Sequence, residues 1–160
     1  MTPAPAFASR AEFQAALLWG FEAALASGAR KLWCVDRDFA DWPLDDPALL
    51  DSLGGWLKLP QRRLLLLAAH YEDMGLRHPR FVAWRRNWVH AIDTLSPSES
   101  GLELPSLLVD DGAVCVQLVD AVHWRGQARL DVPAATPFRQ AIDALIQRSA
   151  PAFPTSHLGL

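Results

Sequence analysis

The apolar run at positions 64–69, Leu-Leu-Leu-Leu-Ala-Ala, constrains the fold of this chain more than any other segment. It has no polar alternation, and Pro60 precedes it while His70 and Tyr71 follow it. A short continuous apolar run is typical of a parallel strand that helices cover on both faces. The segment therefore predicts a central strand of an α/β sheet.

Helices are predicted on both sides of a second short strand. Residues 9–12, Ser-Arg-Ala-Glu, have the form of a capping box, and apolar residues recur after them at helical spacing until Gly28. The apolar run 32–35 then predicts a strand, and Asp46 followed by Pro47 predicts the start of a second helix. Together with the run at 64–69, these elements predict a parallel β-α-β unit.

Antiparallel strands are predicted for the second half of the chain. Asp110-Asp111-Gly112 lies between two apolar runs, which is a strong hairpin signal. The other predicted elements are a third helix from His78-Pro79, a short strand over 89–95, an irregular connection over 96–105, a strand at about 123–132 and a last helix from Thr136-Pro137. The fold class is therefore α/β, a mixed sheet with helices on both faces, in a single domain over residues 1–160.

Composition excludes several classes of protein. The chain is 51% hydrophobic and 21% charged, as expected of a globular domain rather than a disordered one. We find no signal-peptide pattern at the start and no run of about 18 apolar residues, so we expect a cytoplasmic protein without a membrane segment. Cys34 and Cys115 lie in apolar runs and predict buried thiols, not a disulfide or a zinc site.

Charge is distributed unevenly, although the net charge is only −3. Residues 36–51 hold six aspartates against one arginine, a net of −5, and residues 61–90 hold six arginines against two acidic residues, a net of +4. Three of these arginines, Arg80, Arg85 and Arg86, belong to the third predicted helix. They predict either a phosphate-binding groove or ion pairs with the aspartates of the first loop.

Position in the sheet selects the other candidate ligand-binding residues. Open α/β sheets bind ligands beyond the carboxyl ends of their parallel strands. That rule selects Asp36, Arg37 and Asp38 after the first strand and His70 after the second, and His90 is a further candidate. No motif indicates a metal or a cofactor, and we expect neither. Tryptophans are numerous, and Trp42 and Trp124 are interpreted as partner anchors or as cover for the edge of the core.

The order of elements and the hairpin at 106–112 resemble one half of the phospholipase D superfamily fold. Active enzymes of that superfamily carry H-x-K-x4-D at this place. Aligning the aspartate with Asp110 puts Glu103 and Pro105 at the histidine and lysine positions, and aligning it with Asp111 puts Leu104 and Ser106 there. The motif is not intact, so the resemblance implies a pseudoenzyme without phosphohistidine chemistry.

Within that superfamily, the chain is similar to an uncharacterised bacterial domain that can occur fused to GNAT acetyltransferases. The resemblance spans nearly the whole chain and rests on Arg10 with the first helix, the segment 35–38, the segment 80–92 and the closing segment 138–160 with Arg148-Ser149-Ala150-Pro151. It supports the fold more than any function. Paired halves in the superfamily imply a homodimer.

Three functional hypotheses follow. The first is a non-catalytic binding or regulatory module that recognises a phosphate-containing ligand or a protein partner between the acidic first loop and the arginines of the third helix. The second is a hydrolase or transferase that uses Asp36 or Asp38 with His70 or His90. The third is a purely structural partner that dimerises through apolar surface.

Overall fold

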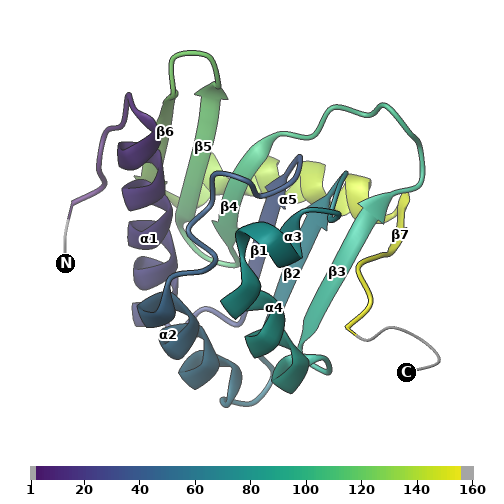
Figure 1. The fold of residues 1–160 in the computed structure, drawn as a ribbon. Helices are drawn as coiled ribbons and strands as arrows, with labels where there is room; N and C mark the ends of the chain where they lie inside the picture. Colours follow the sequence, from purple (N-terminus) through teal and green to yellow (C-terminus); the bar gives the residue numbers. More distant parts are fainter. Residues whose placement is uncertain (1–2, 156–160) are drawn as a thin grey trace.

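The fold is that of a computed structural model, and residues 3–155 are described. Its elements follow the predicted order, with short additions (Figure 1). The helices are α1 (Arg10–Ala26), α2 (Pro47–Leu57), α3 (Met74–Arg77), α4 (Pro79–Arg85), the 3-10 helix η1 (Arg86–Trp88) and α5 (Val132–Ile146). The strands are β1 (Lys31–Asp36), β2 (Arg63–Ala68), β3 (Ile92–Pro97), β4 (Ser106–Asp110), β5 (Val114–Asp120), β6 (Arg125–Leu130) and β7 (Ser149–Pro151).

All seven described strands form one sheet in the order β6-β5-β4-β1-β2-β3-β7. Strands β1, β2 and β3 are parallel, and β4, β5, β6 and β7 each join the sheet antiparallel to a neighbour. In the centre, Cys34 pairs with Leu66 on one side and with Leu108 on the other. The predicted mixed sheet is confirmed, and its most apolar runs occupy the middle, where both faces are covered.

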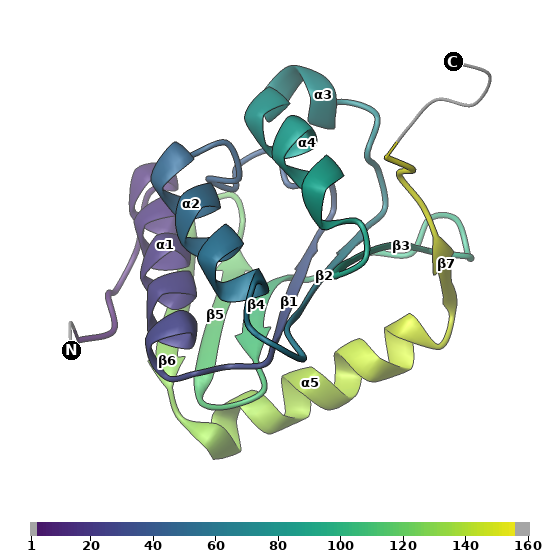
Figure 2. The same cartoon turned by 90° about the horizontal axis from the view of Figure 1, so that it is seen from below.

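Helices cover both faces of the sheet (Figure 2). Helices α1, α2 and α4 lie on one face, and α5 crosses the other face alone. Because side chains of a strand alternate between faces, Leu32 and Cys34 belong to the core under the first group, and Val35 and Leu67 belong to the core under α5. No helix within residues 3–155 is long and apolar enough to cross a membrane.

Helix α1 begins and ends as its sequence predicts. The Ser9 side chain accepts a hydrogen bond from the N–H of Glu12, and Gly28 follows the helix with a φ of +76°. In its middle, Gly20 lets the helix approach the sheet closely, because a Cβ there would lie 2.9 Å from side-chain atoms of Leu108 and Val116. The antiparallel half of the sheet is therefore held against α1.

Two element boundaries differ from the prediction. Residues after α4 continue as the 3-10 helix η1, so β3 begins at Ile92 and not near 89. The last helix begins at Val132, because Asp131 caps it and Pro133 occupies its first turn, and Pro137 lies inside the helix instead of starting it. Both differences concern helix ends, where local signals compete.

The interpretation of Trp42 as a surface anchor is wrong. Trp42 is only 2% exposed, and its ring packs edge-on against Phe39 and Phe21 under α1. Trp124 is partly buried and packs against Phe13, so it covers the edge of the core. Both cysteines are buried free thiols, as predicted.

Candidate functional site

Asp36, at the carboxyl end of β1, is held by three hydrogen bonds. The main-chain N–H groups of Asp38 and Phe39 donate to its Oδ2, and the Ser106 hydroxyl donates to its Oδ1 at 2.6 Å. Burial raises the pKa of Asp36, while these hydrogen bonds act in the opposite direction. The carboxylate therefore ties the start of β4 to the loop after β1.

The neighbouring candidates at this edge are mostly exposed. Main-chain N–H groups of Ala69 and His70 donate to the carbonyl oxygen of Arg37, and the His70 ring lies 3.5 Å from the Glu72 carboxylate. The Asp38 carboxylate accepts the N–H of Ala40, as in a turn. In the part of the chain that the structure describes, no three histidine, cysteine or acidic side chains gather to hold a metal ion.

His90 lies at the opposite end of the sheet from His70. It precedes β3, and its carbonyl oxygen accepts a hydrogen bond from Arg63, the first residue of β2, whereas His70 follows the last residue of that strand. A strand of this length spans about 20 Å. Asp36 and His70 therefore cannot share one constellation with His90.

The three arginines of the predicted groove point in different directions. Arg80 is exposed, and its guanidinium lies 3.7 Å from Asp45 of the first loop, as the ion-pair alternative predicts. Arg86 is exposed on η1. Arg85 is 5% exposed and is buried between α4 and β3. Helical geometry explains the separation, because five residues rotate a side chain by about 140° and one residue by about 100°.

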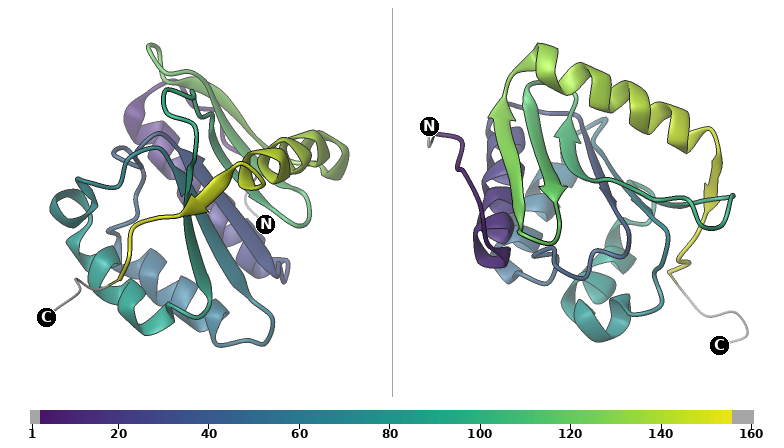
Figure 3. Two further views of the ribbon diagram at one scale, coloured as in Figure 1. Left: turned by 90° about the vertical axis from the view of Figure 1, so that its right-hand side faces the viewer. Right: turned by 90° about the horizontal axis from the view of Figure 1, so that it is seen from above.

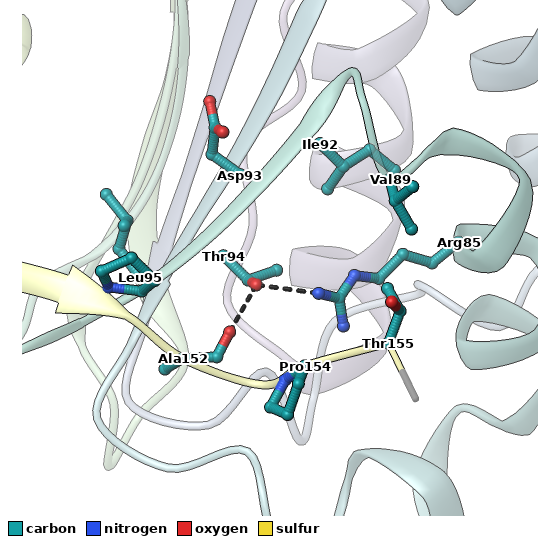
Figure 4. A pocket seen from close by; sticks show the side chains of 10 residues that line it. Arg85, Val89, Ile92, Asp93, Thr94, Leu95, Ala152, Pro154 and Thr155 are labelled. Carbon is teal, nitrogen blue, oxygen red and sulfur yellow. Dashed lines mark hydrogen bonds between the residues drawn. The ribbon is translucent and has the colours of Figure 1, made fainter. Parts of the chain in front are cut away.

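Arg85, the last residue of α4, lines a pocket of about 630 Å³ between Val89, the outer edge of β3 and residues 151–155 (Figure 4). The guanidinium lies between the strand and that segment, directed toward Thr94. The pocket is lined by Arg85, Val89, Ile92, Asp93, Thr94, Leu95, Pro151, Ala152, Pro154 and Thr155. Most of these side chains are apolar, and Arg85 is the only basic residue among these described lining residues.

One hydrogen bond and one aromatic ring hold the guanidinium of Arg85. Its Nη2 donates to Thr94 Oγ1 at 2.9 Å, and the Thr94 hydroxyl in turn donates to the Ala152 carbonyl at 2.6 Å. The guanidinium carbon lies 4.4 Å from the centre of the Phe153 ring, in cation–π contact. The buried Nε has no hydrogen-bond partner among residues 3–155.

Arg85 has no carboxylate partner among the described residues. Asp93 also lines the pocket, but both of its oxygens accept hydrogen bonds from Arg63, at 3.0 and 2.8 Å. Burial lowers the pKa of Arg85, and only the nearby Tyr71 acts against this shift. A buried cation is normally paired, so this arginine has the character of a site for an external anion.

The segment after β7 creates the pocket. Strand β7 pairs with the outer edge of β3 (Figure 3), and the N–H of Ala152 still donates to the Thr94 carbonyl. Phe153 then adopts a φ of +57°, which turns the chain away from β3, and its ring stacks on Tyr71 at 5.1 Å. The space left beside Ile92 and Asp93 is the pocket. The sequence prediction lacked β7 and therefore this cavity.

A second groove, of about 430 Å³, lies between α2 and α4. The rings of Trp84 and Trp88 approach Gly54 there, at 3.4 and 3.6 Å from a Cβ placed on that glycine. Lys58 and Arg80 also line it. This groove holds no buried cation without a partner among the described residues, so the Arg85 pocket is the stronger candidate site.

Comparisons with known proteins support the fold class. No family model matches the sequence, and no curated protein matches it. The structure is similar to TrmBL2, an archaeal chromatin protein described with a novel mode of DNA binding, with a TM-score of 0.61 and 10% identity over 95% of this chain and 56% of that one. The chain thus spans little more than half the length of TrmBL2.

A second similar structure is Nuc from Salmonella typhimurium, a phospholipase D family member, with a TM-score of 0.54 and 9% identity over 87% of this chain and 91% of Nuc. At these identities the likeness concerns the fold alone. The α/β architecture of this chain, with its mixed sheet and helices on both faces, thus resembles one half of a phospholipase-D-like fold.

The residues aligned with the superfamily motif have other roles in this structure. Glu103 and Pro105 are exposed in the connection before β4, and Leu104 packs against the core under α5. Ser106 opens β4 and donates to Asp36. None of these four side chains is a nucleophilic imidazole or a cation for a phosphate.

Proposed function

We propose that this protein is a cytoplasmic, non-catalytic binding or regulatory module of phospholipase-D-like fold, a pseudoenzyme that binds a phosphate-containing or other anionic ligand. The observation that carries the proposal is Arg85, a buried cation that lines a pocket of about 630 Å³ without a carboxylate partner among residues 3–155. An arginine binds phosphate and carboxylate groups through its fork of N–H donors.

The site differs from the groove predicted from sequence. Of the candidate residues, Arg85 alone lines the pocket. Arg80 and Arg86 are exposed elsewhere, and Asp36 accepts a hydrogen bond from Ser106 at the carboxyl end of β1. The ligand therefore enters beside β3 rather than between the first loop and α4.

The proposal is tested by titrating phenyl phosphate into wild-type protein, Arg85→Gln and the matched control Arg86→Gln, at low and at high salt. We expect Arg85→Gln to lose at least tenfold in affinity and Arg86→Gln to stay within twofold of wild type. Arg85→Lys, which keeps the charge, serves as a second variant if Arg85→Gln is poorly folded. Equal affinity of all four proteins for phenyl phosphate would refute the proposal.

A second candidate is a hydrolase or transferase centred on Asp36, favoured by its raised pKa and its short hydrogen bond from Ser106. Against it, both Asp36 oxygens already accept hydrogen bonds, and His90 lies at the other end of the sheet. Hydrolysis of a chromogenic phosphodiester by purified protein, abolished in Asp36→Asn, would favour this candidate over the binding module.

The proposed module acts as a homodimer. The chain matches 91% of the length of Nuc, and its resemblance to one half of the phospholipase D superfamily fold implies that two copies pair. Exposed apolar side chains also lie on and beside the edge strand β6: Val119, Val122, Leu130 and Val132. Light scattering at micromolar concentration is expected to give twice the monomer mass, and a monomer mass would exclude the dimer.

A further inference from the structure

We propose that the Arg85 pocket binds a small amphiphile, a molecule in which a single oxyanion group is joined to an apolar body of about eight carbon atoms. The inference rests on the proposed anion-binding function and adds the class of ligand. Carboxylates and phosphate monoesters share this chemistry, and the pocket's charge, its unused donors and its walls all favour it.

The charge of the pocket matches one oxyanion and not a polyanion. Arg85 is the only basic residue among the described lining residues, and the Asp93 carboxylate is neutralised by its two hydrogen bonds from Arg63. A nucleic-acid backbone or a polyphosphate presents several charges and is bound by several cations. One guanidinium without a carboxylate partner among residues 3–155 matches a ligand with one anionic group.

The guanidinium has donors to spare. An arginine carries five N–H donors, and the described structure engages one of those of Arg85, in the hydrogen bond to Thr94. Thr94 itself is occupied, because its hydroxyl donates to Ala152. The anionic group is therefore recognised by Arg85 alone, while Thr94 and the Phe153 ring hold the guanidinium in place.

The walls of the pocket match an apolar body. Ile92 and Leu95 line it from β3, Pro151 and Pro154 from the opposite segment, and Val89, which is 50% exposed, lies beside them. The volume of about 630 Å³ is that of a small-molecule site and exceeds what a free phosphate ion fills. An inorganic anion would leave this apolar surface in contact with water, whereas a chain of carbon atoms covers it.

The test is calorimetric titration of the full chain at neutral pH with octanoate, octyl phosphate, inorganic phosphate, octanol and a short oligodeoxynucleotide. We expect octanoate and octyl phosphate to bind at least tenfold more tightly than inorganic phosphate, octanol or the oligonucleotide. Arg85→Gln should lose at least tenfold for both amphiphiles, Arg85→Lys should retain part of the affinity, and Arg86→Gln should match wild type. Val89→Ser should weaken octanoate but not inorganic phosphate.

The possible failures separate the two proposals. If inorganic phosphate binds as tightly as octyl phosphate and both depend on Arg85, the apolar body is refuted and the anion-binding function stands. A tighter, Arg85-dependent binding of the oligonucleotide likewise refutes the amphiphile and leaves the anion-binding function standing. If octanol binds as tightly as octanoate without regard to Arg85, or if no probe binds, both proposals are overturned.

Discussion

Replacing Thr94 by valine removes one hydroxyl group from the wall of the Arg85 pocket and changes the shape of the side chain little. The hydroxyl accepts the hydrogen bond from Arg85 and donates one to Ala152. A hydrogen bond to a charged group contributes about 1.5–3 kcal/mol and a neutral one about 1 kcal/mol. The methyl group of valine recovers roughly 0.8 kcal/mol by burial. We therefore expect Thr94→Val to lower the free energy of unfolding by about 2–3 kcal/mol.

The assay is urea unfolding at neutral pH, followed by tryptophan fluorescence. Thr94→Ser is the matched control, because it keeps the hydroxyl and loses only a methyl group, at a cost of about 1 kcal/mol. Affinity for octanoate should fall in Thr94→Val, since the guanidinium loses the group that orients it. Ordinary surface substitutions change the free energy of unfolding by about 0.5 kcal/mol or less. If the free energy of unfolding of Thr94→Val also stays within about 0.5 kcal/mol of wild type, these hydrogen bonds do not stabilise the fold.

Three further predictions concern the hairpin carboxylate Asp110, a close contact at the edge strand β6 and the two thiols. Burial raises the pKa of Asp110 in the folded chain. Its contribution to stability is therefore present below the ordinary aspartate pKa and is lost as the pH rises through the pKa of the folded state. Asp110→Asn should make the free energy of unfolding less pH-dependent in acid titrations. Gly126→Ala should destabilise the protein by about 1–3 kcal/mol in urea, because the added Cβ would collide with a main-chain oxygen of β5, whereas Gly55→Ala, with open space around it, should not destabilise it. Burial raises the pKa of the Cys34 thiol, and that of Cys115 to about 11, so neither should react with Ellman's reagent until the chain is unfolded.

Much of the architecture was accessible from local sequence. The run at 64–69 forms the interior strand β2, which begins and ends one residue earlier, at Arg63–Ala68, because an apolar segment without alternation is stable only where helices cover both faces. Asp110 and Gly112 predict the hairpin between β4 and β5. In the structure, the main-chain N–H of Gly112 donates a hydrogen bond to the Asp110 carboxylate in the turn. These features depend on neighbours in the chain.

The candidate site followed only in part. Arg85 was among the predicted residues, but its grouping with Arg80 and Arg86 came from closeness in sequence, whereas the structure distributes the three over different surroundings. The candidates at the carboxyl ends of β1 and β2 mainly stabilise turns, because aspartates after a strand accept hydrogen bonds from main-chain N–H groups of the following loop.

The sequence by itself determined the α/β class, the parallel and antiparallel halves and the absence of an H-x-K-x4-D motif, because periodicity, caps and motifs are properties of short segments. Tertiary structure alone decided that the Arg85 guanidinium is buried without a carboxylate partner in the described part of the chain. Helix α5 crosses the far face of the sheet and returns the chain to the outer edge of β3. The Arg85 pocket forms there, because this return brings residues 151–155 next to residues 85–95. Whether a buried cation is paired depends on which distant side chains the fold brings within hydrogen-bonding distance, and sequence spacing carries no record of that distance.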